Sequence, residues 1–146
     1  MVRMHGASLL ELLVCLVLLA TLASTGALRL PEILAGVRLS GTTHRLSAAL
    51  RQARGRALER GGPVEIVVDE IAGAWEMRDA NGSSLEREVL PRGVRFTGWP
   101  ASRRVRFSAI GTADNATLVL GAGSASRRIV VNQRGRGWRC RRCRWR

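Results

Sequence analysis

The sequence predicts an α+β fold in which one long N-terminal helix packs on antiparallel β-sheets. Three observations support this prediction. An apolar run fills residues 12–28, an amphipathic helical pattern follows over residues 33–60, and short alternating segments occupy residues 64–131. These patterns are typical of an apolar helix, a half-buried helix and half-buried strands. A chain of 146 residues leaves room for one small globular domain after the apolar helix.

The apolar run is nearly long enough to span a membrane. Residues 12–28 carry no charge, and at ~1.5 Å per residue they extend roughly 25 Å, slightly less than the ~30 Å hydrocarbon core of a bilayer. Starting the helix at Leu9 closes the gap but includes Glu11. Because a carboxylate inside a membrane costs about 3 kcal/mol, Glu11 requires a partner or a function.

The stretch from Gly6 to Glu11, Gly-Ala-Ser-Leu-Leu-Glu, resembles the processing motif of type IV pilins and type II secretion pseudopilins. This resemblance implies that a prepilin peptidase removes residues 1–6 as a leader, cutting between Gly6 and Ala7, and that the new amino terminus of Ala7 is methylated. It also implies that Glu11 guides the subunit into a filament, where the amine of a neighbouring chain would offset the desolvation of the carboxylate. The family usually has Phe where this chain has Ala7.

Two other interpretations of the N-terminus compete with this one. A secretory signal peptide needs a small-residue exit, which residues 20–27 could supply, but the six-residue leader and the internal carboxylate argue against it. A plain single-pass anchor fits the positive-inside rule, because Arg3 and His5 precede the run. We expect residues 7–30 to cross the bacterial inner membrane once, with the C-terminal domain in the periplasm.

Residues 31–62 are expected to form an amphipathic helix that continues into the globular domain. Pro31 predicts a bend or a local restart at the membrane exit. Residues of one helical face then recur at spacings of three and four, namely Leu39, Thr43, Leu46, Leu50, Ala53 and Ala57. Gly61 and Gly62, followed by Pro63, predict the end of the helix. His44 has no second ligand at metal-binding spacing, which favours a surface position.

Residues 63–133 are predicted to form an antiparallel β domain whose strands have one buried and one solvent-facing side. Alternation with period two recurs in residues 64–68, 75–78, 94–97, 104–107, 118–120 and 129–131. The pair Asn81-Gly82 predicts a tight turn, after which residues 85–90 form the return strand. The amphipathic helix would cover an apolar sheet face.

A second resemblance covers the globular part. Residues 46–64 closely resemble the segment that leads from the helix into the first strand in the GspH/FimT branch of minor pseudopilins. Residues 107–112, 117–120 and 128–131 resemble the C-terminal half of the same branch. The resemblance implies a pilin-like fold and a minor subunit of a type II secretion pseudopilus or type IV pilus-like filament. Its partners would be other pilin or pseudopilin subunits, the prepilin peptidase and the inner membrane.

The end of the chain, residues 134–146, holds seven arginines and two tryptophans. Arginine pairs bidentately with phosphate, and tryptophan offers a stacking face for bases. FimT-like members of the branch bind DNA during uptake through a Gly-Arg-x-Arg element, which residues 135–139 resemble with the second arginine one place later. The alternative function is therefore a DNA-binding minor pilin in natural transformation. Its candidate residues are Arg134, Arg136, Arg139, Arg141, Arg142 and Arg144. A basic extension that is solvated or contacts anionic lipid is the competing interpretation.

The cysteines and the other reactive side chains point to no catalysis. Cys140 and Cys143 form a Cys-x-x-Cys pair outside the predicted membrane span, where a disulfide is the preferred interpretation. A zinc site would need a second pair of ligands, and a thioredoxin-like motif would need a βαβ context. Cys15 lies in the apolar run and behaves as a small hydrophobic residue. We expect no catalytic residues, no metal site and no cofactor, and therefore no enzyme.

Overall fold

The computed structural model describes residues 9–135 and 137–140, and for residues 22–29 and 137–140 it describes the backbone alone. The chain divides into two compact units, Met1–Leu34 and Ala35–Arg146. A single helix, α1 (Leu9–Arg60), contributes to both units and includes Pro31. Of the two outcomes that we predicted at Pro31, the local restart is therefore not observed, and the bend stays a prediction. A proline inside a helix costs roughly 3 kcal/mol, but the sequence on both of its sides favours helix.

The predicted membrane span falls largely on the first unit. Among the residues whose side chains the structure describes, no helix has an apolar stretch long enough to cross a membrane. The span over residues 7–30 stays a prediction from the sequence.

Helix α1 ends where the sequence predicts. Gly61 has a positive φ of 62°, which is the left-handed conformation that commonly follows the last helical residue and that glycine adopts without strain. Arg60 lies in the last turn, where a cation interacts favourably with the helix dipole. The chain then enters the first strand at Val64.

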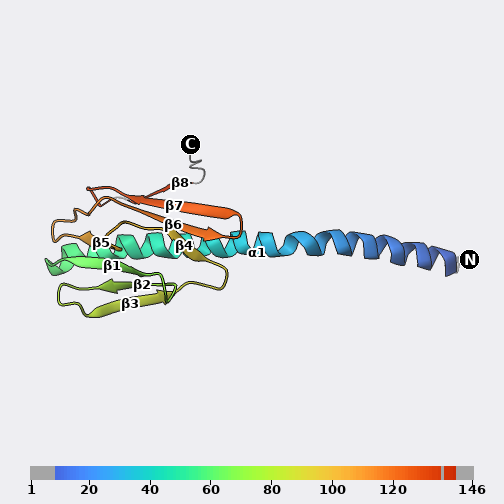
Figure 1. The fold of residues 1–146 in the computed structure, drawn as a ribbon, viewed down its shortest axis with the longest axis horizontal. Coiled ribbons are helices and arrows are strands. Elements are labelled where there is room, and N and C mark those ends of the chain that lie inside the picture. The colour runs from blue at the N-terminus through green and yellow to red at the C-terminus, as the bar shows by residue number, and fades with distance from the viewer. Residues whose placement is uncertain (1–8, 136, 141–146) are drawn as a thin grey trace, which may run out of the picture. The chain divides into compact units, whose positions relative to one another are not determined.

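Within the described residues, eight strands follow the helix and form two antiparallel sheets (Figure 1). The strands are β1 (Val64–Asp69), β2 (Ala74–Arg78), β3 (Ser84–Val89), β4 (Arg95–Gly98), β5 (Arg104–Phe107), β6 (Ala116–Ala122), β7 (Ala125–Val131) and β8 (Gly137–Cys140). Sheet A has the order β3-β2-β1-β5, and sheet B has the order β4-β6-β7-β8. In Figure 1, β3 and β8 lie at opposite sides of the globular unit.

The turn between β2 and β3 confirms the prediction from Asn81-Gly82. Gly82 has a φ of 80°. The Asp79 carboxylate accepts hydrogen bonds from the backbone amides of Asn81 and Ser83, both at 2.9 Å. A short side-chain acceptor that binds backbone amides two and four residues later is typical of such turns.

Strand β8 is an element that the sequence analysis did not predict, because it lies in the arginine-rich end that we expected to follow the β domain. It pairs antiparallel with β7, with Gly137 opposite Val131 and Cys140 opposite Arg128. Four residues without apolar alternation give no strand signal of their own. The pairing with β7 is therefore what defines this strand.

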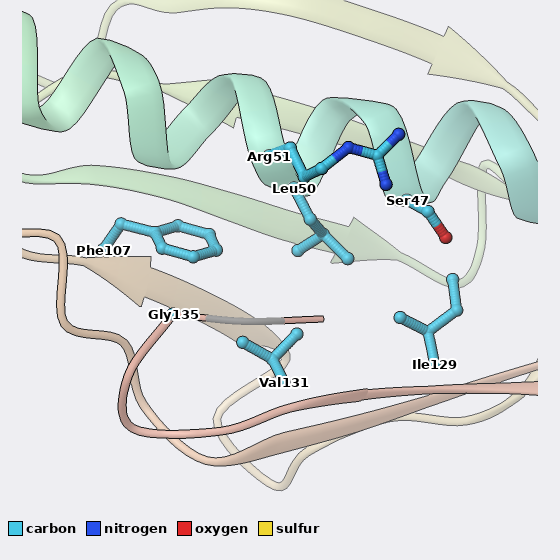
Figure 2. Close-up of a pocket in the computed structure, with 7 residues that line it drawn as sticks. All are labelled: Ser47, Leu50, Arg51, Phe107, Ile129, Val131 and Gly135. Atoms are coloured by element: carbon cyan, nitrogen blue, oxygen red, sulfur yellow. The ribbon is translucent and has the colours of Figure 1, made fainter. Parts of the chain in front are cut away.

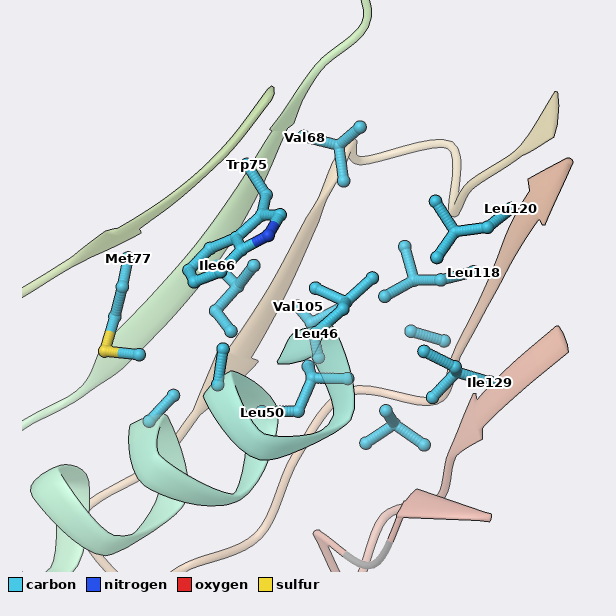
Figure 3. Close-up of a cluster of buried hydrophobic side chains, with 14 of the residues drawn as sticks. Leu46, Leu50, Ile66, Val68, Trp75, Met77, Val105, Leu118, Leu120 and Ile129 are labelled. Carbon is cyan, nitrogen blue, oxygen red and sulfur yellow. The ribbon is translucent and has the colours of Figure 1, made fainter. Parts of the chain in front are cut away.

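One hydrophobic core joins α1 to both sheets (Figure 3). Leu46 and Leu50 of α1 lie between Ile66 of sheet A and Leu118 of sheet B, and each of these side chains is at most 3% exposed. Three buried hydroxyl groups on α1 belong to Thr42, Thr43 and Ser47, and they donate to backbone carbonyl oxygens four residues earlier. Such bonds satisfy a hydroxyl group inside a helix.

Candidate functional site

The N-terminal segment of α1 is apolar and exposed around one carboxylate. Glu11 lies in the first turn of the helix, where a negative charge interacts favourably with the helix dipole. The described large apolar side chains of the first unit are 45–86% exposed, and they are Leu9, Leu10, Leu12, Leu13, Val14, Leu16, Val17, Leu18, Leu19, Leu30, Ile33 and Leu34. Exposed apolar side chains gathered on one segment are typical of surfaces that contact protein or membrane.

Several predicted site residues lie outside the described residues. Gly6 and Ala7, the predicted cleavage position, belong to this group, as do Arg136, Arg141, Arg142, Cys143 and Arg144. For Arg139 and Cys140 only the backbone is described, in β8. The predicted disulfide between Cys140 and Cys143 therefore stays a prediction. Arg134 is described and exposed, and Cys15 is an exposed free cysteine.

The outer face of sheet A carries acidic and basic side chains in register. Glu76 lies opposite Arg87, and Glu65 lies opposite both Arg78 and Arg106. Arg78 contacts Glu76 at 2.7 Å, and Arg104 approaches Glu65 to 3.7 Å. The hydrogen bonds from Arg78 and then from Ser84 hold the pKa of the Glu76 carboxyl below its ordinary value. The same bond with Glu76 raises the pKa of the Arg78 guanidinium.

Further ion pairs join sheet A to helix α1, link two of its strands, and connect two neighbouring loops. Arg45 on α1 bonds to Glu88 on β3 at 3.1 Å. Two longer pairs, both at 4.0 Å, join Arg87 to Asp69 and Arg103 to Glu70. All five ion pairs recorded for the described residues thus involve carboxylates of residues 65–88. Sheet A is therefore close to electrostatic balance on its outer side.

The strands of sheet B lack this balance of acidic and basic side chains. Its strands carry four arginines and no carboxylate, the arginines being Arg95, Arg127, Arg128 and Arg139. Within the described part of the chain, neither Arg95 nor Arg127 forms an ion pair. The candidate phosphate-binding residues predicted from the sequence all lie in the last 13 residues, and the prediction did not place Arg95, Arg127 and Arg128 together on one sheet. The sequence does indicate an excess of positive charge in this region, because Asp114 is the only acidic residue after Glu88.

The cavities found among the described residues are small. The cavity between α1 and sheet B holds about 20 Å³ and is lined by Leu50, Phe107 and Val131, among others (Figure 2). This is room for roughly one water molecule. Two open grooves on sheet A measure about 280 and 210 Å³, at or below the lower end of ordinary ligand pockets. Within the described residues no group of three His, Cys, Asp or Glu side chains could hold a metal ion.

The arrangement of one helix and two antiparallel sheets around a shared core is the fold of minor pilins and pseudopilins. The type IV minor pilin FimU of Pseudomonas aeruginosa superposes with a TM-score of 0.58 at 19% identity, over 69% of this chain and 87% of that one. The minor pseudopilin EpsH from the type 2 secretion system of Vibrio cholerae gives 0.60 at 11% identity, over 71% and 97%. At these identities the likeness concerns the fold.

Sequence comparison identifies the family. Residues 42–135 match the family described as type II transport protein GspH, and the chain belongs to this family. The type II secretion system protein H of Xanthomonas campestris pv. campestris is 30% identical over 96 residues, which make up 66% of this chain. The matched region spans 55% of the length of that relative. The family predicted from residues 46–64 is thereby confirmed.

Proposed function

We propose that this chain is a minor pseudopilin, a structural subunit of a type II secretion pseudopilus or a related type IV pilus-like filament. The family and the fold support this role, and the exposed apolar surface around Glu11 is the observation that carries it. Such a surface requires a partner, and parallel helices of sister subunits would supply one. The proposed partners are other pilin-like subunits, and the proposed location is the inner membrane with the globular unit in the periplasm.

The role of Glu11 is tested by replacing its charge. Glu11→Gln keeps the size of the side chain but removes the carboxylate that would pair with the amine of a neighbouring subunit. We expect this variant to reach the membrane but to lose cross-linking to other subunits. The matched control is Glu32→Gln, which removes an exposed carboxylate from the same helix and should assemble normally. Equal assembly of both variants would contradict the role of Glu11.

Processing by a prepilin peptidase is a separate part of the proposal. Mass spectrometry of the protein recovered from cells should find a chain that begins with methylated Ala7. Gly6→Val should block the cleavage and leave the leader attached. A mature chain that begins at Met1, or within residues 20–27, would contradict this processing.

A gene deletion tests which type of filament contains this subunit. Deleting the gene and scoring protein secretion, twitching and transformation together separates a secretion pseudopilus from a type IV pilus. Loss of secretion alone would assign the chain to a secretion system. Loss of twitching and transformation would assign it to a pilus.

DNA binding during uptake is the second candidate function, and the absence of carboxylates from the strands of sheet B favours it. Neutralising phosphate charges releases counterions, so affinity for duplex DNA should fall steeply with salt. Deleting residues 134–146 should weaken binding and reduce the salt slope. Unchanged affinity and slope would remove this function and leave the filament proposal intact.

A further inference from the structure

The turn between β7 and β8 packs closely against α1 at Gly135. This glycine is buried, has a φ of 67°, and donates its amide to the carbonyl oxygen of Asn132 at 2.8 Å. Figure 2 shows it on the segment that follows Val131, beside the cavity that Leu50 and Phe107 also line. Gly135 therefore lies where sheet A, sheet B and α1 come together.

No side chain fits at position 135. A Cβ atom there would overlap the carbonyl oxygen of Gly111 and would lie 3.0 Å from both Cδ and Nε of Arg54. Arg54 itself donates from Nε to the same Gly111 oxygen at 3.1 Å. We call Arg54, Gly111 and Gly135 the glycine junction. Its three members come from α1, from the β5–β6 connection and from the β7–β8 turn.

Contacts with α1 and hydrogen bonds within the loop fix the position of the β5–β6 connection around Gly111. A Cβ atom on Gly111 would lie 3.1 Å from Cδ2 of Leu58, one turn after Arg54 on α1. The loop around Gly111 is closed by a backbone bond from Ser108 to Thr112 at 2.8 Å and by contact of their hydroxyl groups at 2.6 Å. Gly111 thus offers a fixed surface against which Gly135 can pack.

Strand β8 begins two residues after Gly135, and its described residues form four register pairs with β7. It is an edge strand of sheet B. We propose that the glycine junction positions β8, and with it the start of the arginine-rich end of the chain, by fixing the β7–β8 turn to α1. This inference goes beyond the filament role and holds whether or not the segment binds DNA.

The test is hydrogen exchange on the full chain in detergent, read at the amides of residues 138–140. Gly135→Ala should make these amides exchange roughly tenfold faster, while the amides of β1 and β2 keep their protection. The matched control is Gly123→Ala in the β6–β7 turn. Gly123 also has a positive φ, 57°, but a Cβ atom there meets nothing within 4 Å. Equal effects of the two variants on β8 would overturn the proposal, because backbone strain alone would then explain them.

A second pair of variants tests the glycine junction without substituting Gly111 or Gly135. Arg54→Ala removes the bond to Gly111 and should also speed exchange in β8. Arg38→Ala, on an exposed position nearer the start of the same helix, should leave it unchanged. If Gly135→Ala fails to fold, Arg54→Ala and its control test the proposal by themselves. Unchanged exchange in β8 of Arg54→Ala would overturn the proposal.

Discussion

Sheets A and B of the globular unit bury similar inner faces but differ in the charges that their strands carry. Ile66 and Met77 of sheet A and Leu118 and Leu120 of sheet B are each 0% exposed and contribute to one core. The outer face of sheet A pairs carboxylates with arginines. The strands of sheet B carry arginines and no carboxylate, with Arg95 and Arg128 on the outer face and Arg127 opposite Leu120 at the margin of the inner face.

This difference shows that folding constrains the apolar inner faces of the sheets more strongly than their charged positions. Burial of apolar surface supplies most of the favourable free energy of folding, so both inner faces must be apolar. Charges that reach solvent contribute little to stability, so the charged residues of the two sheets can differ without loss of the fold. An unbalanced positive surface is instead suited to attract an anionic partner.

The largest expected effect tests the shared core. Ile66→Ala in sheet A and Leu118→Ala in sheet B should each lower the free energy of unfolding by about 3 kcal/mol, because each leaves a cavity among fully buried side chains. Urea denaturation of the full chain in detergent measures this change. The exposed control Thr117→Ala should alter the free energy by less than about 0.5 kcal/mol.

Hydrogen exchange extends this test to cooperativity. Because one core joins the sheets, each core variant should weaken protection in both of them. A variant that loosened only its own sheet would show that the two sheets unfold independently.

An intermediate effect is expected for polyanion binding. The double variant Arg95→Gln with Arg127→Gln should reduce the salt slope of heparin binding by about one for each arginine that contacts a charged group. The variant Arg87→Gln with Arg104→Gln lowers the net charge equally but removes arginines that are paired with carboxylates. Its slope should change less. Equal slopes for the two variants would show that net charge, and not its location on sheet B, determines binding.

The smallest expected effect concerns acid stability through Glu76. Its folded-state pKa lies below the ordinary value of 4.5, so the stabilisation is present above that value and is lost as the pH falls through the folded-state pKa. Glu76→Gln should therefore unfold at lower urea than the parent at pH 7, with the difference vanishing near pH ~2. Glu59→Gln, at the exposed end of α1, is the control. A constant difference from pH 7 to pH ~2 would contradict the ion-pair origin of the shift.

Much of the fold could be predicted because its signals are local. The helical face that contains Leu46 and Leu50 is buried as its spacing indicates. The six alternating segments became strands β1, β2, β4, β5, β6 and β7, and the return strand after Asn81-Gly82 became β3. The Asn81-Gly82 turn and the helix end at Gly61 were also local, because each depends on the conformational freedom of glycine. The resemblance of residues 46–64 identified the family correctly.

Other features depend on partners distant in the sequence. Strand β8 exists through its pairing with β7, and Arg54 meets Gly111 although 57 positions separate them. The pairing of Arg45 with Glu88 joins residues 43 positions apart. Residue pattern does not encode such contacts, because they arise only once the helix and sheets have packed.

The sequence by itself determined the class of element along nearly the whole chain, the position of Glu11 within an apolar helix, and the excess of arginine toward the C-terminus. Those properties follow from local periodicity and composition. The tertiary structure decided which charges face each other, which sheet is left with arginines alone, and that Gly135 must be a glycine. These outcomes require distant segments to meet at distances of a few ångströms, which only the packed core imposes.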